Sequence, residues 1–307
     1  MNPEEHKREK ERRFLFYVSF FSVFFQILAH GNHELLFGFL LGSMLCCLLV
    51  FEGMNGLFSN EGENVSNKKI FFGKKFFFGK KIFLDKKEKN IRNIKRERSY
   101  FFSFSVILAL ILSADYLFFR RTGGNQMSRF DGGVLFLMLF VFLWTEVRNK
   151  DFIGNLAEWR QSLTKEKNIV FFIIKIILKM ICICVAGYFL VDWVIGFCMK
   201  HHIRYSLAGV LFLSWVVQGV NVIFGRNAGG IEEMCDSMTF DVIFLFLCSF
   251  GLWAVLSPLS ISYEEIISLI VMSILSIFMV WRDKVSKRIA GSLMLTLYVA
   301  GVIFFIR

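Results

Sequence analysis

The stretch VIFLFLCSFGLWAVLSPLSISY, from Val242 to Tyr263, runs for 22 residues without a charged side chain. A helix needs about 20 mostly apolar residues to cross a bilayer, because each residue adds only about 1.5 Å along its axis. The sequence therefore predicts an all-α, polytopic integral membrane protein. Further uncharged stretches of 14 to 21 residues occupy 14–33, 35–51, 99–114, 132–145, 205–225, 266–281 and 289–306.

Composition supports this class and excludes others. The 307 residues are 55% hydrophobic, with a mean hydropathy of +0.55, whereas disordered chains have low hydrophobicity. Cationic residues at the inner face of a membrane account for the formal charge of +11, so we expect a lipid bilayer as partner and no nucleic acid. The sequence contains no nucleophile–base constellation and no phosphate-binding glycine loop. We therefore expect neither an enzyme nor a bound cofactor.

Charge divides the chain into four parts. A basic polar tail covers 1–13 and a first membrane half covers 14–147. A polar loop covers 148–167, and a second membrane half covers 168–307.

A Lys/Phe-rich insertion at 60–98 interrupts the first half. It contains a six-residue repeat, KKIFFG-KKFFFG-KKIFLD, whose lysine pairs make a simple membrane span costly. Three interpretations stay open: a low-complexity expansion, a degraded membrane helix, or a segment lying on an anionic leaflet. In the last of these, the predicted lipid head-group contacts are Lys74, Lys75, Lys80 and Lys81.

Basic loops predict the orientation, since cytoplasmic loops are rich in Lys and Arg. This rule places 85–98, 148–167 and 282–288 on the inner side. If 70–84 spans, the chain has ten transmembrane helices and its basic tail lies outside. If that segment does not span, there are nine helices and the tail lies inside, which charge favours.

The two halves resemble each other in sequence. Residues 128–141 match 286–299 at an offset of 158, through GVLFLMLFV and GSLMLTLYV. ELLFG at 34–38 matches YSLAG at 205–209 at an offset of 171. Two halves of five helices would have opposite topology, because five is odd. We therefore expect two inverted five-helix repeats, with a site near the bilayer midplane where the halves meet.

Four short motifs follow one another in the second half: VAGYFLVD at 185–192, SLAG at 206–209, DSMTFDV at 236–242 and LSPL at 256–259. In order and spacing they resemble the calcium/cation antiporter superfamily, which includes the sodium/calcium exchangers. The resemblance covers most of 180–307 and 98–147, and weakly 14–50. It implies the exchanger fold and cation exchange by alternating access.

In that family a GTSLPE-like signature in each half faces a GSNIFD-like signature, and their oxygens bind calcium or sodium. By spacing from Gly209, this chain has Asn221 in place of the acid and Val220 in place of the helix-breaking proline. The first-half slot, 45–50, holds no ligand. Without proline, we expect these helices to stay continuous. The cation-binding set that the resemblance implies is Asp241, Ser237, Asn221, Gln218 and Glu52.

The leading interpretation is an exchanger-like antiporter that carries calcium, sodium, potassium or protons. The loss of ligands favours monovalent or proton-coupled movement. The alternative is a non-transporting membrane scaffold or lipid-interaction protein that keeps the exchanger fold.

Alternative roles for individual polar residues also stay open. Gln218 and Asn221 share one helix face, where they form interhelical hydrogen bonds or line an ion path. Asp241 either caps a helix or points into the core. We expect Glu146 and Asp192 to be interfacial or paired residues.

Overall fold

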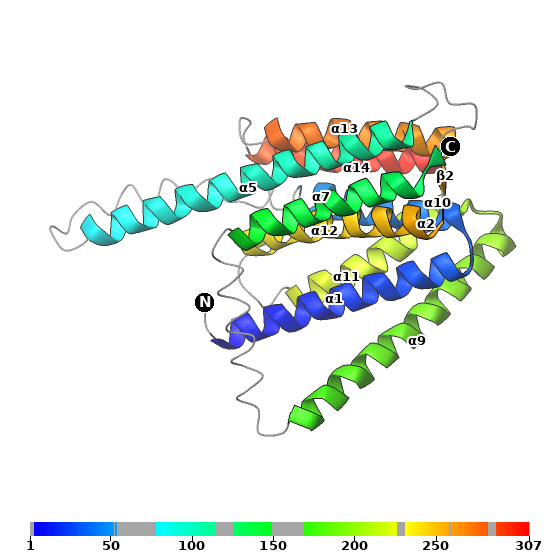
Figure 1. The fold of residues 1–307 in the computed structure, drawn as a ribbon, viewed down its shortest axis with the longest axis horizontal. Helices are drawn as coiled ribbons and strands as arrows, with labels where there is room; N and C mark the ends of the chain where they lie inside the picture. The colour runs from blue at the N-terminus through cyan, green and yellow to red at the C-terminus, as the bar shows by residue number, and fades with distance from the viewer. Residues whose placement is uncertain are drawn as a thin grey trace.

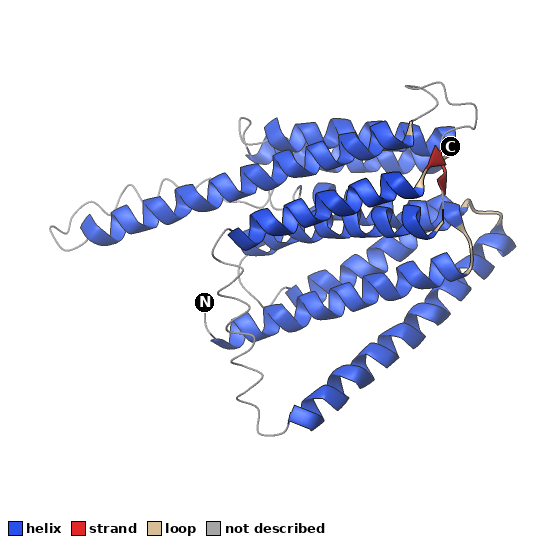
Figure 2. Cartoon of the chain, in the orientation of Figure 1, coloured by secondary structure: helices blue, strands red, loops and turns tan. Residues whose placement is uncertain are grey.

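The computed structural model describes residues 3–51, 53, 78–114, 126–148, 169–225, 231–257, 259–281 and 287–306. Helices make up nearly all of this part of the chain, which confirms the all-helical expectation (Figure 2). The helices are α1 (Pro3–Ala29), α2 (His33–Leu45), the π-helix η1 (Cys46–Phe51), α5 (Phe78–Ser113), α7 (Arg129–Arg148), α9 (Ile169–His201), α10 (Tyr205–Ala208), the π-helix η2 (Gly209–Leu213), α11 (Ser214–Gly225), α12 (Ile231–Leu256), α13 (Tyr263–Trp281) and α14 (Lys287–Ile306).

Several of these helices have the length and composition of membrane spans. Four windows are long and apolar enough to cross a bilayer: Arg129–Val147, Ile176–His201, Thr239–Leu256 and Tyr263–Trp281. Shorter apolar helices cover Phe14–Ala29, His33–Leu45, Tyr205–Gly219 and Arg288–Ala300. The described chain is thus compatible with a membrane protein.

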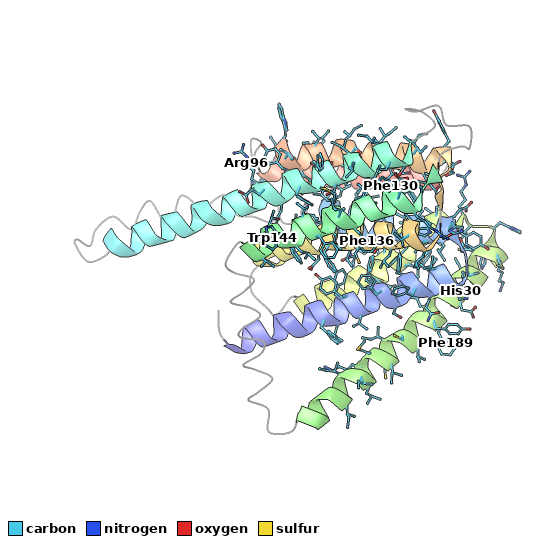
Figure 3. The ribbon with its side chains drawn as sticks, in the orientation of Figure 1. His30, Arg96, Phe130, Phe136, Trp144 and Phe189 are labelled. Carbon is cyan, nitrogen blue, oxygen red and sulfur yellow. The ribbon has the colours of Figure 1, made fainter. Side chains whose placement is uncertain are left out.

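The outside of the bundle is apolar as well as its core. Phe130 is 79% exposed, Trp144 72% and Phe189 64% (Figure 3), and many other large apolar side chains of the described helices are exposed as well. A water-soluble monomer rarely exposes contiguous apolar surface of this extent. The surface matches the hydrocarbon of a bilayer.

A two-residue strand pair joins two loops at one end of the bundle. Strands β1 (Gln126–Met127) and β2 (Leu259–Ser260) are antiparallel, with Met127 opposite Leu259. A helix follows each strand and starts with a capping box. The Ser128 hydroxyl and backbone N–H donate to Asp131 at 2.7 Å, and the Ser262 N–H donates to Glu265 at 2.7 Å.

Helix directions follow from contacts with α12. Tyr17, in α1, packs on Phe244, and His33, four residues after the end of α1, stacks on Trp253 further along α12, so α1 and α12 run in the same direction. His33, at the start of α2, stacks on Trp253 near the end of α12, so α2 runs the opposite way. Figure 1 shows that the starts of α1, α5, α9, α12 and α14 all lie at one end of the bundle.

The basic tail, the Lys/Arg-rich start of α5 and Arg148 at the end of α7 therefore share one end of the molecule (Figure 1). This arrangement is the one that charge counting favoured. The insertion residues 60–77 and the loop residues 149–168 lie outside the described residues.

Inversion of the two halves is reproduced only in part. Helices α5 and α7 run opposite to α13 and α14, as an inverted repeat requires (Figure 1). Helix α1, however, runs in the same direction as α9, and α2 in the same direction as α10–η2–α11. The number of passes explains these shared directions. The described chain runs along the bundle four times before α9, and an even number of passes returns it to the end of the bundle at which α1 begins.

The sequence-matched glycines of the two halves meet where α2 crosses η2. Gly38 and Gly209 are in direct contact, and a Cβ on Gly38 would overlap the carbonyl oxygen of Ser206. Reciprocally, a Cβ on Gly209 would lie 2.6 Å from the carbonyl oxygen of Leu35, the residue that matches Ser206. Such reciprocal contacts are what a two-fold relation produces. Because the two helices run in the same direction here, the local axis lies along them.

We expect Gly38→Ala to lower the free energy of unfolding by about 1–3 kcal/mol, because the backbone of α10 blocks the new methyl group. Gly133→Ala is the matched control, since a Cβ there meets no atom of the described residues within 4 Å. Thermal unfolding in detergent measures both variants. Equal stability of the two variants would show that the helices do not cross at Gly38.

Candidate functional site

Asp241 lies in the interior of the bundle. Its side chain is 1% exposed, and its Oδ1 atom accepts a hydrogen bond of 2.5 Å from the Tyr17 hydroxyl of α1. Helix α12 begins at Ile231, ten residues earlier, so the interpretation of Asp241 as a helix cap is wrong. A charged carboxylate is costly to bury unless it is paired or hydrogen-bonded, which makes this position a candidate functional site.

Gln218 faces α2 in the same core. Its side chain is 1% exposed, and its Nε2 atom donates to the carbonyl oxygen of Ser43 at 3.4 Å. Gln218 thus forms an interhelical hydrogen bond, which is one of the two alternatives that its sequence position left open. Gln218 and Ser43 also line a small cavity of about 10 Å³, with apolar side chains that include Phe20 and Phe250.

The two deepest polar side chains of the predicted set, Asp241 and Gln218, lie on helices that both line this cavity. Val242, which follows Asp241 in α12, lines the same cavity as Gln218. Asp241 does not line it and turns instead to Tyr17. The structure therefore brings α11 and α12 together around the core, with Gln218 bonded to α2 and Asp241 bonded to α1.

The other predicted ligands are placed by backbone position alone. Ser237 lies one helical turn before Asp241 in α12, and Asn221 lies three residues after Gln218 in α11. Each pair shares a helix face, because residues three or four apart are neighbours on a helix. The side chains of Ser237 and Asn221 lie outside the described part of the structure, as does the whole of Glu52.

The helical segments α2–η1 and α11 continue without a break through the two slots where the sequence resemblance places an acidic signature. The first slot, 45–50, runs into the π-helix η1, and the second slot, 216–221, lies within α11. Neither slot is unwound, as the absence of proline predicted. Backbone carbonyls freed by broken helices, which many transporters use as ligands, are therefore missing from these two places. The wider turn of η1 is a local departure of the type often found at functional sites.

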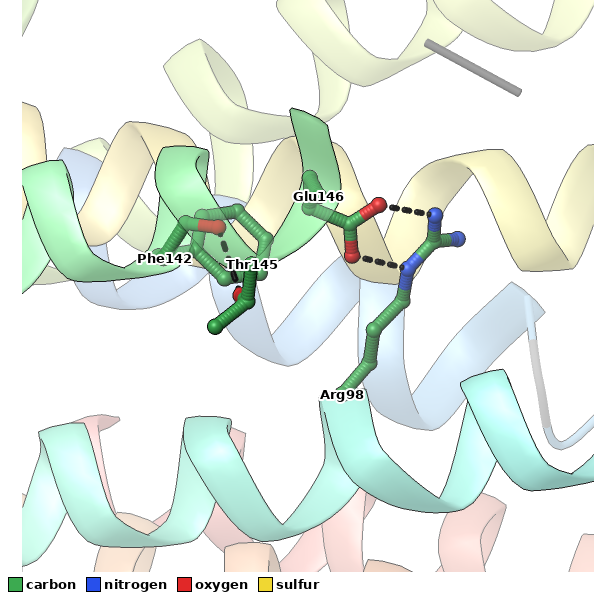
Figure 4. Close-up of polar contacts among 4 residues, drawn as sticks. All are labelled: Arg98, Phe142, Thr145 and Glu146. Atoms are coloured by element: carbon green, nitrogen blue, oxygen red, sulfur yellow. Dashed lines mark hydrogen bonds and ion pairs between the residues drawn. The ribbon is translucent and has the colours of Figure 1, made fainter. Parts of the chain in front are cut away.

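A second polar element joins α5 to α7. Arg98 and Glu146 form a bidentate ion pair with two N···O distances of 2.7 Å (Figure 4). The guanidinium carbon of Arg98 lies 5.6 Å from the ring centre of Phe240, within cation–π range. The expectation that Glu146 is a paired residue is confirmed. Since Phe240 precedes Asp241, the ion pair and the buried carboxylate lie at the same level of α12.

Two of the predicted lipid-contact lysines lie on described backbone. Lys80 and Lys81 are in the first turn of α5, which extends beyond the other helices (Figure 1). Arg98 lies 17 positions after Lys81, or about 25 Å along the helix. Head groups add only about 5–8 Å to each side of the hydrocarbon, so contact with them requires this part of α5 to lean onto the membrane surface. Lys74 and Lys75 lie outside the described residues.

This donor set suits a weakly held cation or a proton. Calcium prefers six to eight oxygen ligands, whereas the described side chains of the predicted set supply one carboxylate and one amide. Within the described residues, no group of three or more His, Cys, Asp or Glu side chains is placed to hold a metal ion.

Sequence reasoning missed three side chains of this region. Tyr17, Ser43 and Arg98 lie 224, 175 and 48 positions from their hydrogen-bond partners, so no local motif connects them. Only for Ser43 did the sequence contain a usable signal. Ser43 matches Ser214 at the same offset of 171 that relates Gly38 to Gly209.

No known protein family and no curated protein matches the chain. Among solved structures, the chain is similar to one described as "Structure of native YfkE", with a TM-score of 0.62 and 12% sequence identity. The similarity covers 98% of this chain and 88% of the other. At this identity the likeness concerns the fold alone. Fold and composition together define an all-helical protein with helices long and apolar enough to cross a membrane.

Proposed function

We propose that this chain is a multi-pass membrane transporter that moves cations by alternating access, with the exchanger-like fold. The observation that carries the proposal is the carboxylate of Asp241, which is 1% exposed within a bundle of apolar helices. Ionisable groups inside membrane bundles are rare and commonly mark ion or proton pathways. Asp241 is the primary cation ligand, and Gln218, Asn221, Ser237 and Glu52 are the secondary ones.

We further propose nine spans, with the basic tail on the same side as the other basic segments. Support comes from the shared end of the basic tail and the start of α5 (Figure 1), because one more pass between α2 and α5 would place them on opposite sides. Full inversion of two five-helix repeats requires an additional pass between α2 and α5. The part of the chain available for that pass is 52–77, outside the described residues.

The proposed cation site has few ligands, and they include an uncharged amide. Such a site favours a monovalent cation or a proton over calcium as the transported ion. Reconstituted protein in vesicles is expected to carry gradient-driven flux of sodium, potassium or protons. Absence of flux for these ions and for calcium would contradict the proposal.

A second candidate function is a membrane scaffold or lipid-interaction protein that has kept the fold without transport. The observation that favours it is the cavity beside Gln218, whose volume of about 10 Å³ leaves no room for a hydrated ion. In this candidate the lysine repeats bind anionic lipid, since basic residues near such a surface each contribute about 1 kcal/mol.

The lysine repeats provide a test of that second candidate. We expect phosphatidylserine in nanodiscs to raise the melting temperature of the wild type relative to phosphatidylcholine alone. Replacement of Lys74, Lys75, Lys80 and Lys81 by glutamine is expected to remove at least half of this difference. Lys200→Gln, at the opposite end of the bundle, is the control (Figure 1). An undiminished lipid effect in the fourfold variant would eliminate the lysine repeats as the lipid-binding segment.

A further inference from the structure

The cavity beside Gln218, which residues of α1, α2, α11 and α12 line, contains two polar residues whose hydrogen-bonding capacity is incompletely used. Ser43 Oγ and Gln218 Oε1 are both buried and have no hydrogen-bond partner among the residues that the structure describes. Ser43 is 4% exposed and Gln218 1%. A buried polar atom without a partner is unfavourable, and most such atoms in proteins are satisfied by protein or by ordered water.

We propose that this cavity is a binding site for a single water molecule, which bridges Ser43 Oγ and Gln218 Oε1. The cavity volume of about 10 Å³ is close to the lower limit for one water. A buried water needs two to four polar partners, and these two side chains provide a hydroxyl, which both donates and accepts, and an accepting amide oxygen. The inference is independent of transport.

A bare cation fits this cavity less well than water does. The two unpartnered atoms are neutral, and sodium-like or calcium-like ions require more oxygen ligands than two. Asp241, the nearby carboxylate, does not line the cavity. Water carries no charge to be compensated, so the two neutral groups suffice.

The water would complete a polar link between the two halves of the chain. Gln218 Nε2 already donates to the Ser43 carbonyl at 3.4 Å, and the bridge would use the remaining atoms of the same two residues. The link lies beside the glycine crossing, where Ser214 Oγ approaches the Cβ position of Gly42 to 2.9 Å. We infer that the water holds α2 and α11 at a fixed separation.

A density map of the wild-type protein in nanodiscs, at a resolution that shows ordered water, tests the site directly. The expected result is one peak at roughly 2.7–3.2 Å from both Ser43 Oγ and Gln218 Oε1. An empty cavity in such a map overturns the proposal. A peak in a protein that shows no flux would refute the transport proposal and leave this one standing.

Stability measurements provide the second arm. Ser43→Ala is expected to lower the melting temperature by about 2–4 °C, the shift for one lost buried hydrogen bond in a chain of this size. Ser249→Ala is the matched control, because its hydroxyl is also buried without a partner in the described part of the chain but does not line the cavity. We expect that control to shift by less than about 1 °C. Equal losses in the two variants overturn the proposal.

A double variant and a change of salt identify the occupant. Ser43→Ala combined with Gln218→Met makes the cavity apolar and dry, so the loss is expected to be smaller than the sum of the single losses. Additive losses argue against a shared water. If sodium chloride stabilises the wild type more than choline chloride does, and Ser43→Ala abolishes the difference, the occupant is a cation and the assignment of water is overturned.

Discussion

Asp241→Asn is expected to lower gradient-driven cation flux in proteoliposomes at least tenfold. Asparagine has nearly the same shape as aspartate and still offers an oxygen to the Tyr17 hydroxyl, so the fold is retained. What is lost is the negative charge of the least exposed acidic side chain that the structure describes. A cation that leaves water for an apolar bundle needs such a charge to offset its desolvation.

Asp192→Asn is the matched control for this experiment. The same chemical change is made on α9, where the Asp192 side chain is exposed. We expect flux in this variant to stay within about twofold of the wild type, because surface substitutions away from a site have small effects. Gel filtration of both variants establishes that each is folded. Unchanged flux in folded Asp241→Asn would remove Asp241 from the proposed cation-binding set.

Glu146→Gln is expected to cause the largest loss of stability among the polar substitutions proposed here, about 2–4 kcal/mol. The change leaves Arg98 without its bidentate partner at a place where the two side chains are only 20% and 9% exposed. Removal of one member of a buried pair typically costs about 3–5 kcal/mol, and the partial exposure of Arg98 reduces that figure. Chemical or thermal unfolding in detergent measures the effect.

The matched comparison is an exposed pair of the same residue types. Arg204 and Glu264 approach to 3.3 Å with side chains that are 52% and 70% exposed. We expect Glu264→Gln to cost less than about 1 kcal/mol, since water screens such pairs. In a double variant, Arg98→Met with Glu146→Leu, most of the stability lost in Glu146→Gln is expected to return. Equal costs at Glu146 and Glu264 would show that the α5–α7 pair is solvated.

The helical class of the fold was predictable from uncharged stretches alone. The window Val242–Tyr263 predicted an apolar helix, and the structure has one from Thr239 to Leu256. Composition determines the helical class because a helix satisfies its backbone hydrogen bonds within its own segment, independently of the helices around it. Helix boundaries were less predictable. Helix α12 begins at Ile231, before its apolar part. Helix α5 includes the basic residues that precede Arg98, although they are not apolar.

The internal matches in sequence identified real contact points but not their geometry. Gly38 and Gly209, matched at the offset of 171, touch each other in the structure. The offset of 158 also maps α7 onto α14, since Arg129–Arg148 and Lys287–Ile306 correspond end to end. The relative direction of the matched helices depends on the number of passes between them, which no local match contains.

By itself, the sequence determined that this chain forms apolar helices, where its basic segments lie, and which small residues allow two helices to cross closely. These properties depend on hydrophobicity, charge and side-chain size, which each residue carries locally. Only the tertiary structure decided that Asp241 bonds to Tyr17, that Glu146 pairs with Arg98, and that the cavity beside Gln218 also involves Ser43. Those contacts join helices far apart in the chain. They arise because close packing leaves each buried polar group only the partners that neighbouring helices bring within reach.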